Sequence, residues 1–583
     1  MALSRAGKTN VTGSIFIDPA AKEAIYMNAI TMPPVSPVRG ETAQAAGRTA
    51  AEFLLKHLAA WGVRRIYGVI GDANLYVLDA LAEQNDLQYI ACRHEEGAAL
   101  MASAEAKLTG GVGVCLATSG PGIANLLNGL ADAAMDAAGV LAITGQVALS
   151  EIGTPVKQYV DQQRLISAIT DETRLVAHPD ALPKLMHSAL TAAYLYGKVA
   201  HLSIPRDLFT QRVAGSVVPY GEHLHQPLAA PPETVREAVR MLARAERPAL
   251  LVGRGIKNCA AQVVRLAETL DAPVATTLPA RPLFPNDHPL FTGVLGQAGS
   301  EAAGALLAES DLVAVLGADW WPDEFVPPRA PVLQIDQSAA QLGKSGPLKF
   351  GVVGDLRLIL PQLLDGLARE RGERSAWRKR VEQETRAWNA RIVQEAKSEG
   401  TPVAPQRVIA AVAEAAAPDA VLAVDTGDHT LWFGRIFQAK PGQDILVSGR
   451  WRTLGFALPA AIAAKLACPE RQVLAVAGDG GAVQTLMEFQ TAVQYNCPVV
   501  LIIMNNGSYA MEKHRMEAGG LKPLGSELVN PDFAAIARAC GGVGYTADSG
   551  EELSRCLKLA LDQRKPAIID VRTAGLKVPH TKI

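Results

Sequence analysis

The sequence has almost no net charge, few cysteines and no long apolar run. Lys plus Arg number 56 and Asp plus Glu 58, a formal net charge of -2, which argues against nucleic acid as a partner. The seven cysteines have no C-x-x-C spacing, so we predict neither a disulfide framework nor a zinc site, and we expect a reducing, cytoplasmic location. Long apolar stretches such as residues 498–504 fall far short of the roughly 20 residues that span a bilayer. We therefore expect no integral membrane segment.

The first 45 residues differ from the rest of the chain. They contain Arg5 and Lys8 but no apolar stretch followed by a small-residue cleavage site, so we predict no signal peptide. Pro33, Pro34 and Pro37 favour an irregular or disordered N-terminal extension.

Helical and strand-like patterns alternate from Arg48 onward, which is typical of parallel sheets covered by helices. Prolines between residues 208 and 232 and dense Arg and Glu between 366 and 400 interrupt this alternation; the second stretch predicts a solvated helix and linker. We predict an α/β fold with three doubly wound parallel-sheet domains. The predicted segments are an extension (1–45), a first domain (46–215), a central domain (233–370), a linker (371–403) and a last domain (404–583).

The most informative stretch is residues 472–506, a predicted βαβ unit. A strand over 473–477 ends at Gly-Asp-Gly-Gly, a helix follows over 482–495, and a strand over 498–504 ends at Asn-Asn. Parallel strands place their carboxyl ends at one edge of the sheet, so Asp479 and Asn506 should lie close together. Oxygen donors suit Mg²⁺, and glycines let backbone N–H groups approach a phosphate. Each half taken alone could also be an ordinary turn or loop.

The two motifs at this spacing resemble those of thiamine diphosphate (ThDP) enzymes. The resemblance implies that Asp479, Asn506 and the backbone carbonyl of Ser508 hold Mg²⁺ on the cofactor diphosphate. It implies cofactor binding by the neighbouring residues of the same two motifs, which are Gly478, Gly480, Gly481 and Asn505.

Residues 93–99, Arg-His-Glu-Glu-Gly-Ala-Ala, follow a predicted strand and precede an Ala-rich helix. They resemble the His-Glu segment of the same family, which implies that Glu95 binds N1′ of the aminopyrimidine ring and supports deprotonation of the cofactor at C2. A buried carboxyl group with a raised pKa suits that role. The alternative is that Glu95 and Glu96 only favour a helix N-terminus. The resemblance gives His94 and Gln158 roles with protons or substrate.

Further family matches lie in the first and last domains. Ser119-Gly120-Pro121-Gly122 resembles the Gly-Pro-Gly turn of the pyrimidine-binding domain, and Leu454 falls where the family places an apolar wedge that bends the cofactor. The resemblance implies cofactor contacts at Gly120, Gly427, Asp428, His429, Leu454 and Gly455. Asp428 is an unusual neighbour for phosphates, so His429 and backbone amides are the better candidates.

The domain order resembles the pyruvate oxidase and acetolactate synthase branch of the family. This implies decarboxylation of a 2-oxo acid, with pyruvate first, and transfer of the enamine to an oxidant. One alternative is carboligation as in acetolactate synthase. The others are a non-catalytic relative that binds ThDP or flavin, and a nicotinamide dehydrogenase. The family builds each site across a subunit interface, which implies a homodimer or homotetramer.

The same branch binds FAD in its central domain, and Gly253, Arg281 and Asp336 fall at comparable places. Gly253-Arg254-Gly255 is not a full G-x-G-x-x-G, so nicotinamide binding is not supported.

Two departures from the family pattern concern the identity of the substrate. Lys157-Gln158-Tyr159 stands where the branch commonly has Phe-Gln-Glu, and a charged cluster over residues 512–515 stands on the expected active-site helix. That cluster is either a solvated helix face or part of a pocket for a different, more anionic substrate.

Overall fold

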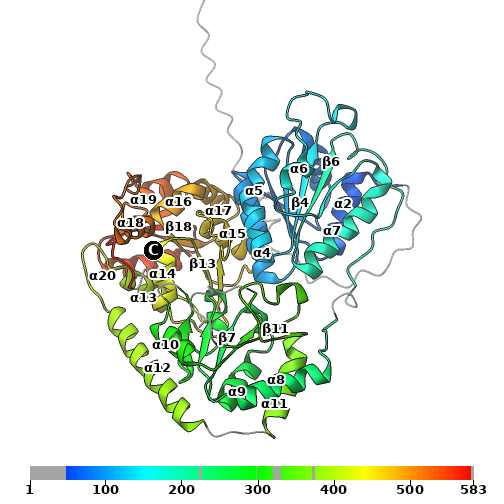
Figure 1. Cartoon of the computed structure of the whole chain (residues 1–583). Coiled ribbons are helices and arrows are strands. Elements are labelled where there is room, and N and C mark those ends of the chain that lie inside the picture. Colours follow the sequence, from blue (N-terminus) through cyan, green and yellow to red (C-terminus); the bar gives the residue numbers. More distant parts are fainter. Residues whose placement is uncertain (1–46, 222–225, 297–298, 320–329, 370–373, 580–583) are drawn as a thin grey trace, which may run out of the picture. The chain divides into compact units, whose positions relative to one another are not determined.

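The computed structural model describes residues 47–221, 226–296, 299–319, 330–369 and 374–579. The predicted extension over residues 1–45 lies outside these ranges. The described chain forms three six-stranded sheets in which every neighbouring pair of strands is parallel (Figure 1). This confirms the predicted α/β class with three doubly wound domains.

The first domain has the strand order β2-β1-β3-β4-β6-β5. Its strands are β1 (Arg65–Gly68), β2 (Gln88–Ala91), β3 (Gly113–Ala117), β4 (Val140–Gln146), β5 (Thr173–Leu175) and β6 (Val199–Pro205). Its helices are α2 (Ala50–Ala60), α3 (Leu75–Ala82), α4 (Glu95–Thr109), α5 (Pro121–Met135), α6 (Gln162–Ile166) and α7 (Leu182–Tyr196).

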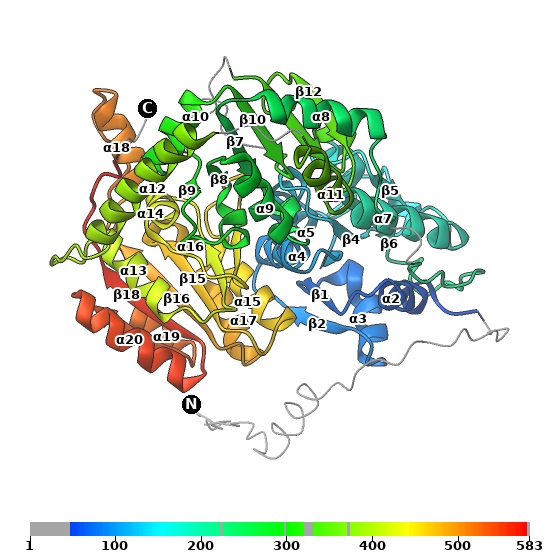
Figure 2. The ribbon, with the colours of Figure 1, turned by 90° about the horizontal axis from the view of Figure 1, so that it is seen from below.

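The central domain has the order β12-β11-β10-β7-β8-β9. Its strands are β7 (Pro248–Val252), β8 (Val274–Thr276), β9 (Phe291–Val294), β10 (Leu312–Leu316), β11 (Val332–Asp336) and β12 (Phe350–Val353). Its helices are α8 (Pro232–Arg244), α9 (Ala260–Leu270), α10 (Glu301–Glu309) and α11 (Leu356–Leu367); α11 packs against α8 and α9 (Figure 2).

The last domain has the order β14-β13-β15-β16-β18-β17, the same topology as the first domain. Its strands are β13 (Val421–Val424), β14 (Asp444–Val447), β15 (Val473–Gly478), β16 (Val499–Asn505), β17 (Val543–Ala547) and β18 (Ala567–Arg572). Its helices are α13 (Pro405–Ala415), α14 (Asp428–Ile436), α15 (Ala457–Ala467), α16 (Asp479–Thr485), α17 (Phe489–Gln494), α18 (Ala510–Ala518), α19 (Phe533–Ala539) and α20 (Gly550–Gln563).

One hydrophobic core joins the first and last domains. The Ala-rich helix α4 packs against α5 in its own domain and against α15 in the last domain (Figure 1). Small side chains along α4 and α15 allow the helices to approach closely, and Gly110 ends α4 with φ +74°, a left-handed conformation that glycine adopts without strain. Strands β15 and β16 are buried along almost their whole length, as expected for parallel strands covered on both faces.

Two segments differ from their sequence-based predictions. The helix predicted over 482–495 begins at Asp479 and is divided by a 3₁₀ turn at Leu486–Glu488. The predicted linker contains α12 (Ser375–Glu395), and this helix is not solvated on all sides. It buries Trp377 and Val381 in the core of the central domain and Trp388 in that of the last domain, because apolar side chains recur at helical spacing among the charges.

Within the described ranges, no helix is both long and apolar enough to cross a membrane.

Candidate active site

A large cavity of ≈ 2670 Å³ is lined by residues of all three domains. In the last domain it lies beyond the carboxyl ends of β13 and β15, with Asp425 following the first strand and Asp479 following the second. These strands are neighbours in the sheet, and the chain leaves them toward opposite sides, to β14 and to β16. Such a switch point leaves a crevice at the carboxyl edge of an open α/β sheet, where ligands bind.

Asp479 and Asn506 both line this cavity, as the βαβ prediction requires. The carboxylate of Asp479 is buried; Oδ1 accepts from Gly480 N–H (2.9 Å) and Oδ2 from Gly507 N–H (2.7 Å). Asn506 Oδ1 accepts from Ser508 N–H (3.0 Å). Burial raises the pKa of Asp479, although these hydrogen bonds oppose the shift. A cation beside the carboxylate would stabilise its charged form.

The donor set fits Mg²⁺ bound to a diphosphate. A carboxylate, an amide oxygen and the Ser508 backbone are hard oxygen ligands, and Mg²⁺ commonly takes few protein ligands together with phosphate oxygens. In the described residues no group of three or more His, Cys, Asp or Glu side chains could hold a metal ion, and this site does not require one. Among the residues that the structure describes, two buried polar atoms beside the motifs lack a hydrogen-bond partner: His429 Nε2 and Ser508 Oγ. Unpaired buried polar atoms are uncommon and are consistent with a polar ligand at this edge.

Asn530 was not predicted from the sequence. Its side-chain Nδ2 donates to Asp479 Oδ2 (2.7 Å) and to Asn505 Oδ1 (2.9 Å), so it fixes the carboxylate and the first residue of the Asn-Asn pair together. Asn505 in turn donates to Asp570 (2.9 Å) and does not line the cavity. Asn505 therefore helps to orient the Asn-Asn motif from a position outside the cavity. Nothing in the local sequence around Asn530 marks this role, because it lies 51 residues after Asp479.

Asp425 is a second residue that the motif analysis missed. Its buried carboxylate accepts from the backbone N–H groups of Thr426 (2.7 Å), Gly455 (3.0 Å) and Ala457 (3.3 Å). Burial raises its pKa to about 7, against the lowering effect of those hydrogen bonds. Asp425 thereby holds Gly455 beside the cavity, where Leu454 is part of the lining. Its position directly after a buried strand, like that of Asp479, was the available signal.

Gly427, Asp428 and His429 form the start of α14 and line the cavity. Burial raises the pKa of Asp428 to about 7 and lowers the pKa of His429 to about 4. His429 is therefore neutral at pH 7 and can donate one ring N–H to an anionic oxygen. Its ring lies against Gly478, where an added Cβ would come within 2.9 Å of Nδ1.

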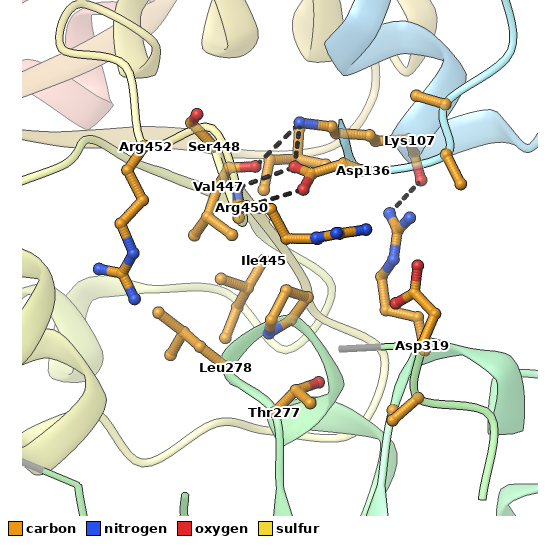
Figure 3. Close-up of a pocket in the computed structure, with 18 of the residues that line it drawn as sticks. Lys107, Asp136, Thr277, Leu278, Asp319, Ile445, Val447, Ser448, Arg450 and Arg452 are labelled. Atoms are coloured by element: carbon orange, nitrogen blue, oxygen red, sulfur yellow. Dashed lines mark hydrogen bonds and ion pairs between the residues drawn. The ribbon is translucent and has the colours of Figure 1, made fainter. Parts of the chain in front are cut away.

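The loop over residues 448–454, which carries Leu454, is joined to the first domain by hydrogen bonds beside a buried ion-pair cluster (Figure 3). Lys107 Nζ lies 2.7 Å from both Asp132 and Asp136 and donates to the carbonyl of Val447 (3.1 Å). Asp136 accepts from the backbone N–H groups of Gly449 (2.8 Å) and Arg450 (2.9 Å). Asn128 adds a hydrogen bond to Thr453 Oγ1 (2.7 Å). Helices α4 and α5 therefore position this loop.

Glu95 begins α4 in the first domain, 8% exposed, and accepts a hydrogen bond from Asn125 (2.9 Å). His94 precedes it as the helix N-cap. Gly120 lies against the backbone of Gln158, since an added Cβ would come within 2.9 Å of the Gln158 carbonyl, and both residues have positive φ. The segment before α4 rests on Glu488 of the last domain, which accepts from the N–H groups of Arg93 and His94 (2.9 Å each).

The predicted residues therefore fall into two groups. None of Glu95, His94, Gly120 and Gln158 lines the cavity that contains Asp479, as far as the described residues show. The lining does include, from the other predicted sets, Gly427, Asp428, His429, Leu454, Gly478, Asp479, Gly480, Gly481, Asn506 and Ser508. Within one chain the structure does not bring Glu95 to the cavity beside the Gly-Asp-Gly motif.

The central domain contributes Gly253, Arg254, Gly255 and Asp336 to the same cavity. Arg281 is not part of the lining. Its guanidinium is fully buried and donates to Asn286 Oδ1 (3.0 Å) and to the carbonyl of Gly434 (2.5 Å), which joins the central and last domains. Burial lowers its pKa to about 9. Arg281 therefore connects the central and last domains in the described structure, and its predicted contact with a cofactor stays a prediction.

Comparisons with known proteins agree with this division into three domains. Residues 48–165 match the thiamine pyrophosphate enzyme N-terminal TPP binding domain, residues 235–363 the central domain and residues 425–571 the C-terminal TPP binding domain. The chain is 36% identical to the putative thiamine pyrophosphate-containing protein YdaP of Bacillus subtilis, over 90% of this chain and 92% of that protein. It is 34% identical to acetolactate synthase isozyme 1 large subunit of Escherichia coli (90% and 94%) and 31% identical to pyruvate oxidase of Lactiplantibacillus plantarum (92% and 90%).

Proposed function

Because the chain belongs to the thiamine pyrophosphate enzymes, in their pyruvate oxidase and acetolactate synthase branch, we propose that it decarboxylates a 2-oxo acid. Pyruvate is the first candidate substrate, with transfer of the remaining two-carbon unit to an oxidant. The observation that carries this proposal is the cavity at the β13/β15 switch point, with Asp479, Asn506 and Ser508 in its wall.

When bound, ThDP supplies the electron sink that the loss of CO₂ requires. Asp479, Asn506 and the Ser508 carbonyl are proposed to hold Mg²⁺. The neutral ring of His429 and the backbone N–H groups of Gly478 and Gly481 would bind the diphosphate, and Leu454 would form part of the cavity wall. In this proposal the carboxyl group of Glu95 would bind the aminopyrimidine ring, and His94 and Gln158 of the same domain would act on protons or substrate.

We propose that each complete site uses two protomers. The Asp479 group and the Glu95 group lie in domains of one chain, yet Glu95 does not line the cavity of that chain. A second copy would supply it, so the working assembly is a homodimer or a homotetramer. In the same proposal Gly253, Arg254, Gly255 and Asp336 bind FAD, because they line the central part of the cavity.

Carboligation of two 2-oxo acids is the second candidate. It is favoured by the 34% identity to a protein named acetolactate synthase over 90% of this chain. The two activities share the first half of the reaction and differ in what receives the two-carbon unit.

The test is release of CO₂ from pyruvate by the purified protein, with and without ThDP and Mg²⁺, together with an absorbance scan. We expect CO₂ release that needs both additions, flavin bands in the scan, and reduction of an added electron acceptor. Formation of acetolactate without acceptor reduction would favour the second candidate. No CO₂ release from any 2-oxo acid would reject the proposal.

A further inference from the structure

Arg452 has an unusual backbone conformation in the loop over residues 448–454. Its φ is +55°, in the left-handed region that arginine rarely adopts, and the residue lines the large cavity. A strained conformation at a non-glycine residue persists when the surrounding structure holds it, and such residues are frequent at binding sites. Asp136 of the first domain holds this loop through Gly449, and Lys107 holds Val447 directly before it. The structure therefore presents a particular side chain to the cavity at some conformational cost.

The side chain of Arg452 extends from its loop into the cavity (Figure 3). Within the part of the chain that the structure describes, no hydrogen bond or ion pair to its guanidinium is found, in contrast to Arg450, whose side chain donates to the Met135 carbonyl (3.3 Å). Burial lowers the pKa of the Arg452 guanidinium, the charge of Arg515 lowers it further, and the charge of Asp136 partly offsets the shift. A charged group that is largely enclosed by protein and has no direct ion-pair partner is stabilised when an anion binds.

Arg515 comes from helix α18 and lines the same cavity. Its guanidinium pairs with Glu512 (3.1 Å), one turn earlier on the helix, so this acid offsets part of the local positive charge. Asp428, on α14, also lines the cavity, and burial raises its pKa to about 7. Lys513, on the same helix, does not line the cavity and pairs with Glu527 (2.7 Å). Of the charged cluster on α18, Glu512 and Arg515 therefore belong to the cavity.

We propose that Arg452 and Arg515 form an oxyanion-binding site at the Leu454 side of the cavity. A planar guanidinium group can donate two parallel hydrogen bonds to a carboxylate or a phosphate. The oxyanion is either the second carboxylate of a dicarboxylic 2-oxo acid substrate or a free inorganic phosphate used with a monocarboxylic substrate. The assignment of the anion to a substrate rests on the proposed function. The binding of an anion rests only on the two arginines.

The first arm of the experiment compares 2-oxoglutarate with 2-oxopentanoate, which carries a methyl group in place of the distal carboxylate. With the ThDP- and Mg²⁺-loaded protein, kcat/KM is measured for both, in wild type, Arg452→Gly and Arg515→Gln. Glycine suits the backbone at position 452, so the first variant should fold. We expect wild type to favour 2-oxoglutarate by about 10-fold or more, mainly through KM, and each variant to lose that preference.

The second arm titrates inorganic phosphate and 2-oxoglutarate into the same loaded proteins by calorimetry. Lys513→Gln is the matched control, since it removes one positive charge from α18 outside the cavity. We expect phosphate or 2-oxoglutarate to bind wild type and the control alike and to bind both arginine variants at least about 10-fold more weakly. Discrimination between the two 2-oxo acids assigns the site to the substrate carboxylate. Phosphate binding without that discrimination assigns it to free phosphate.

The proposal is overturned if neither anion binds to wild type, or if both arginine variants behave like wild type. It is also overturned if the variants change kcat/KM for both 2-oxo acids equally while they bind phosphate as wild type does, because that result shows a general structural effect. If the wild-type protein decarboxylates no 2-oxo acid, the proposed function fails, and the calorimetric arm still decides whether the oxyanion site exists.

Discussion

At the scale of single residues, the structure explains how one carboxylate would serve the proposed Mg²⁺ site without a cluster of acids. Asp479 is held by three hydrogen bonds, from Gly480, Gly507 and Asn530, so its orientation is fixed before any ligand arrives. Fixed oxygen ligands reduce the cost of ordering a site on binding. The proposed Mg²⁺ site therefore depends on one side chain more than on any other.

Replacing Asp479 with Asn should abolish Mg²⁺-dependent retention of ThDP, because an amide cannot supply the negative charge and its NH₂ group would face the Gly507 or Gly480 donor. Bound ThDP after gel filtration, with and without Mg²⁺, measures the effect. Asp548→Asn is the control, since Asp548 is exposed in the same domain and lies outside the cavity. Undiminished retention in Asp479→Asn would reject the metal assignment.

Glu95 is the residue that the proposal gives a proton-handling role. Glu95→Gln keeps the size of the side chain and should slow exchange of the cofactor C2 proton by about 100-fold or more while ThDP stays bound. Proton exchange followed by nuclear magnetic resonance tests this, with exposed Glu83→Gln as the comparison. Wild-type exchange in Glu95→Gln would show that Glu95 only starts helix α4.

At the scale of elements, helices α4 and α5 of the first domain determine where a loop of the last domain lies. Lys107 forms ion pairs with both Asp132 and Asp136, and its side chain is 2% exposed, so water screens these charges little. Its Nζ also lies 4.7 Å from the ring centre of Phe456. Removal of the cation would leave two carboxylates in a largely dry environment.

The Lys107→Met variant should lose about 3–5 kcal/mol of local stability, the usual cost of an unpaired buried charge. Hydrogen exchange along α4 and the 448–454 loop measures this under native conditions, which avoids the assumption of a single unfolding transition. The matched control is Lys56→Met, whose exposed pair with Asp86 should contribute about 0–1 kcal/mol. Equal protection in the two variants would contradict the role of Lys107.

The same contact predicts a dependence on pH. Burial alone would raise the pKa of Asp136, but Lys107 and the Gly449 and Arg450 N–H groups lower it below its usual value. A lowered pKa in the folded state contributes stability above the unfolded value of about 3.9 and loses it as pH falls through the folded value. Protection of the 448–454 loop should therefore be steady near neutral pH and fall below about pH 4. The Asp136→Asn variant should lack that acid-dependent loss.

The sequence predicts those features that depend on local patterns. The buried strands and the residues directly after them placed Asp479 and Asn506 at one sheet edge, and the structure agrees. Asn530, the Lys107 contacts with the 448–454 loop and the left-handed Arg452 were not predicted. Each depends on residues far apart in the sequence or on a backbone conformation that arginine does not favour. The burial of Trp377 and Trp388 in α12 was missed because the surrounding charges dominate the local composition.

At the scale of the whole molecule, two domains with the same strand order carry different parts of the proposed site. The last domain carries the Asp479 group and the first domain carries Glu95, and helices α4 and α15 join them through one core. Glu488 of the last domain holds the backbone of Arg93 and His94, directly before Glu95, and Glu95 does not line the cavity in its own chain. Closed symmetric assembly of two copies is the simplest way to bring both groups to one ligand.

Complementation between two inactive variants tests this central claim most directly. Glu95→Gln and Asp479→Asn are produced separately and also together in equal amounts in one cell, and ThDP-dependent CO₂ release is measured per protomer. If each site combines Glu95 of one copy with Asp479 of the other, half of the dimers are mixed and each has one intact site. The account predicts about one quarter of wild-type activity in the co-produced sample and almost none in either variant alone. No recovery, with mixed dimers present, would contradict it.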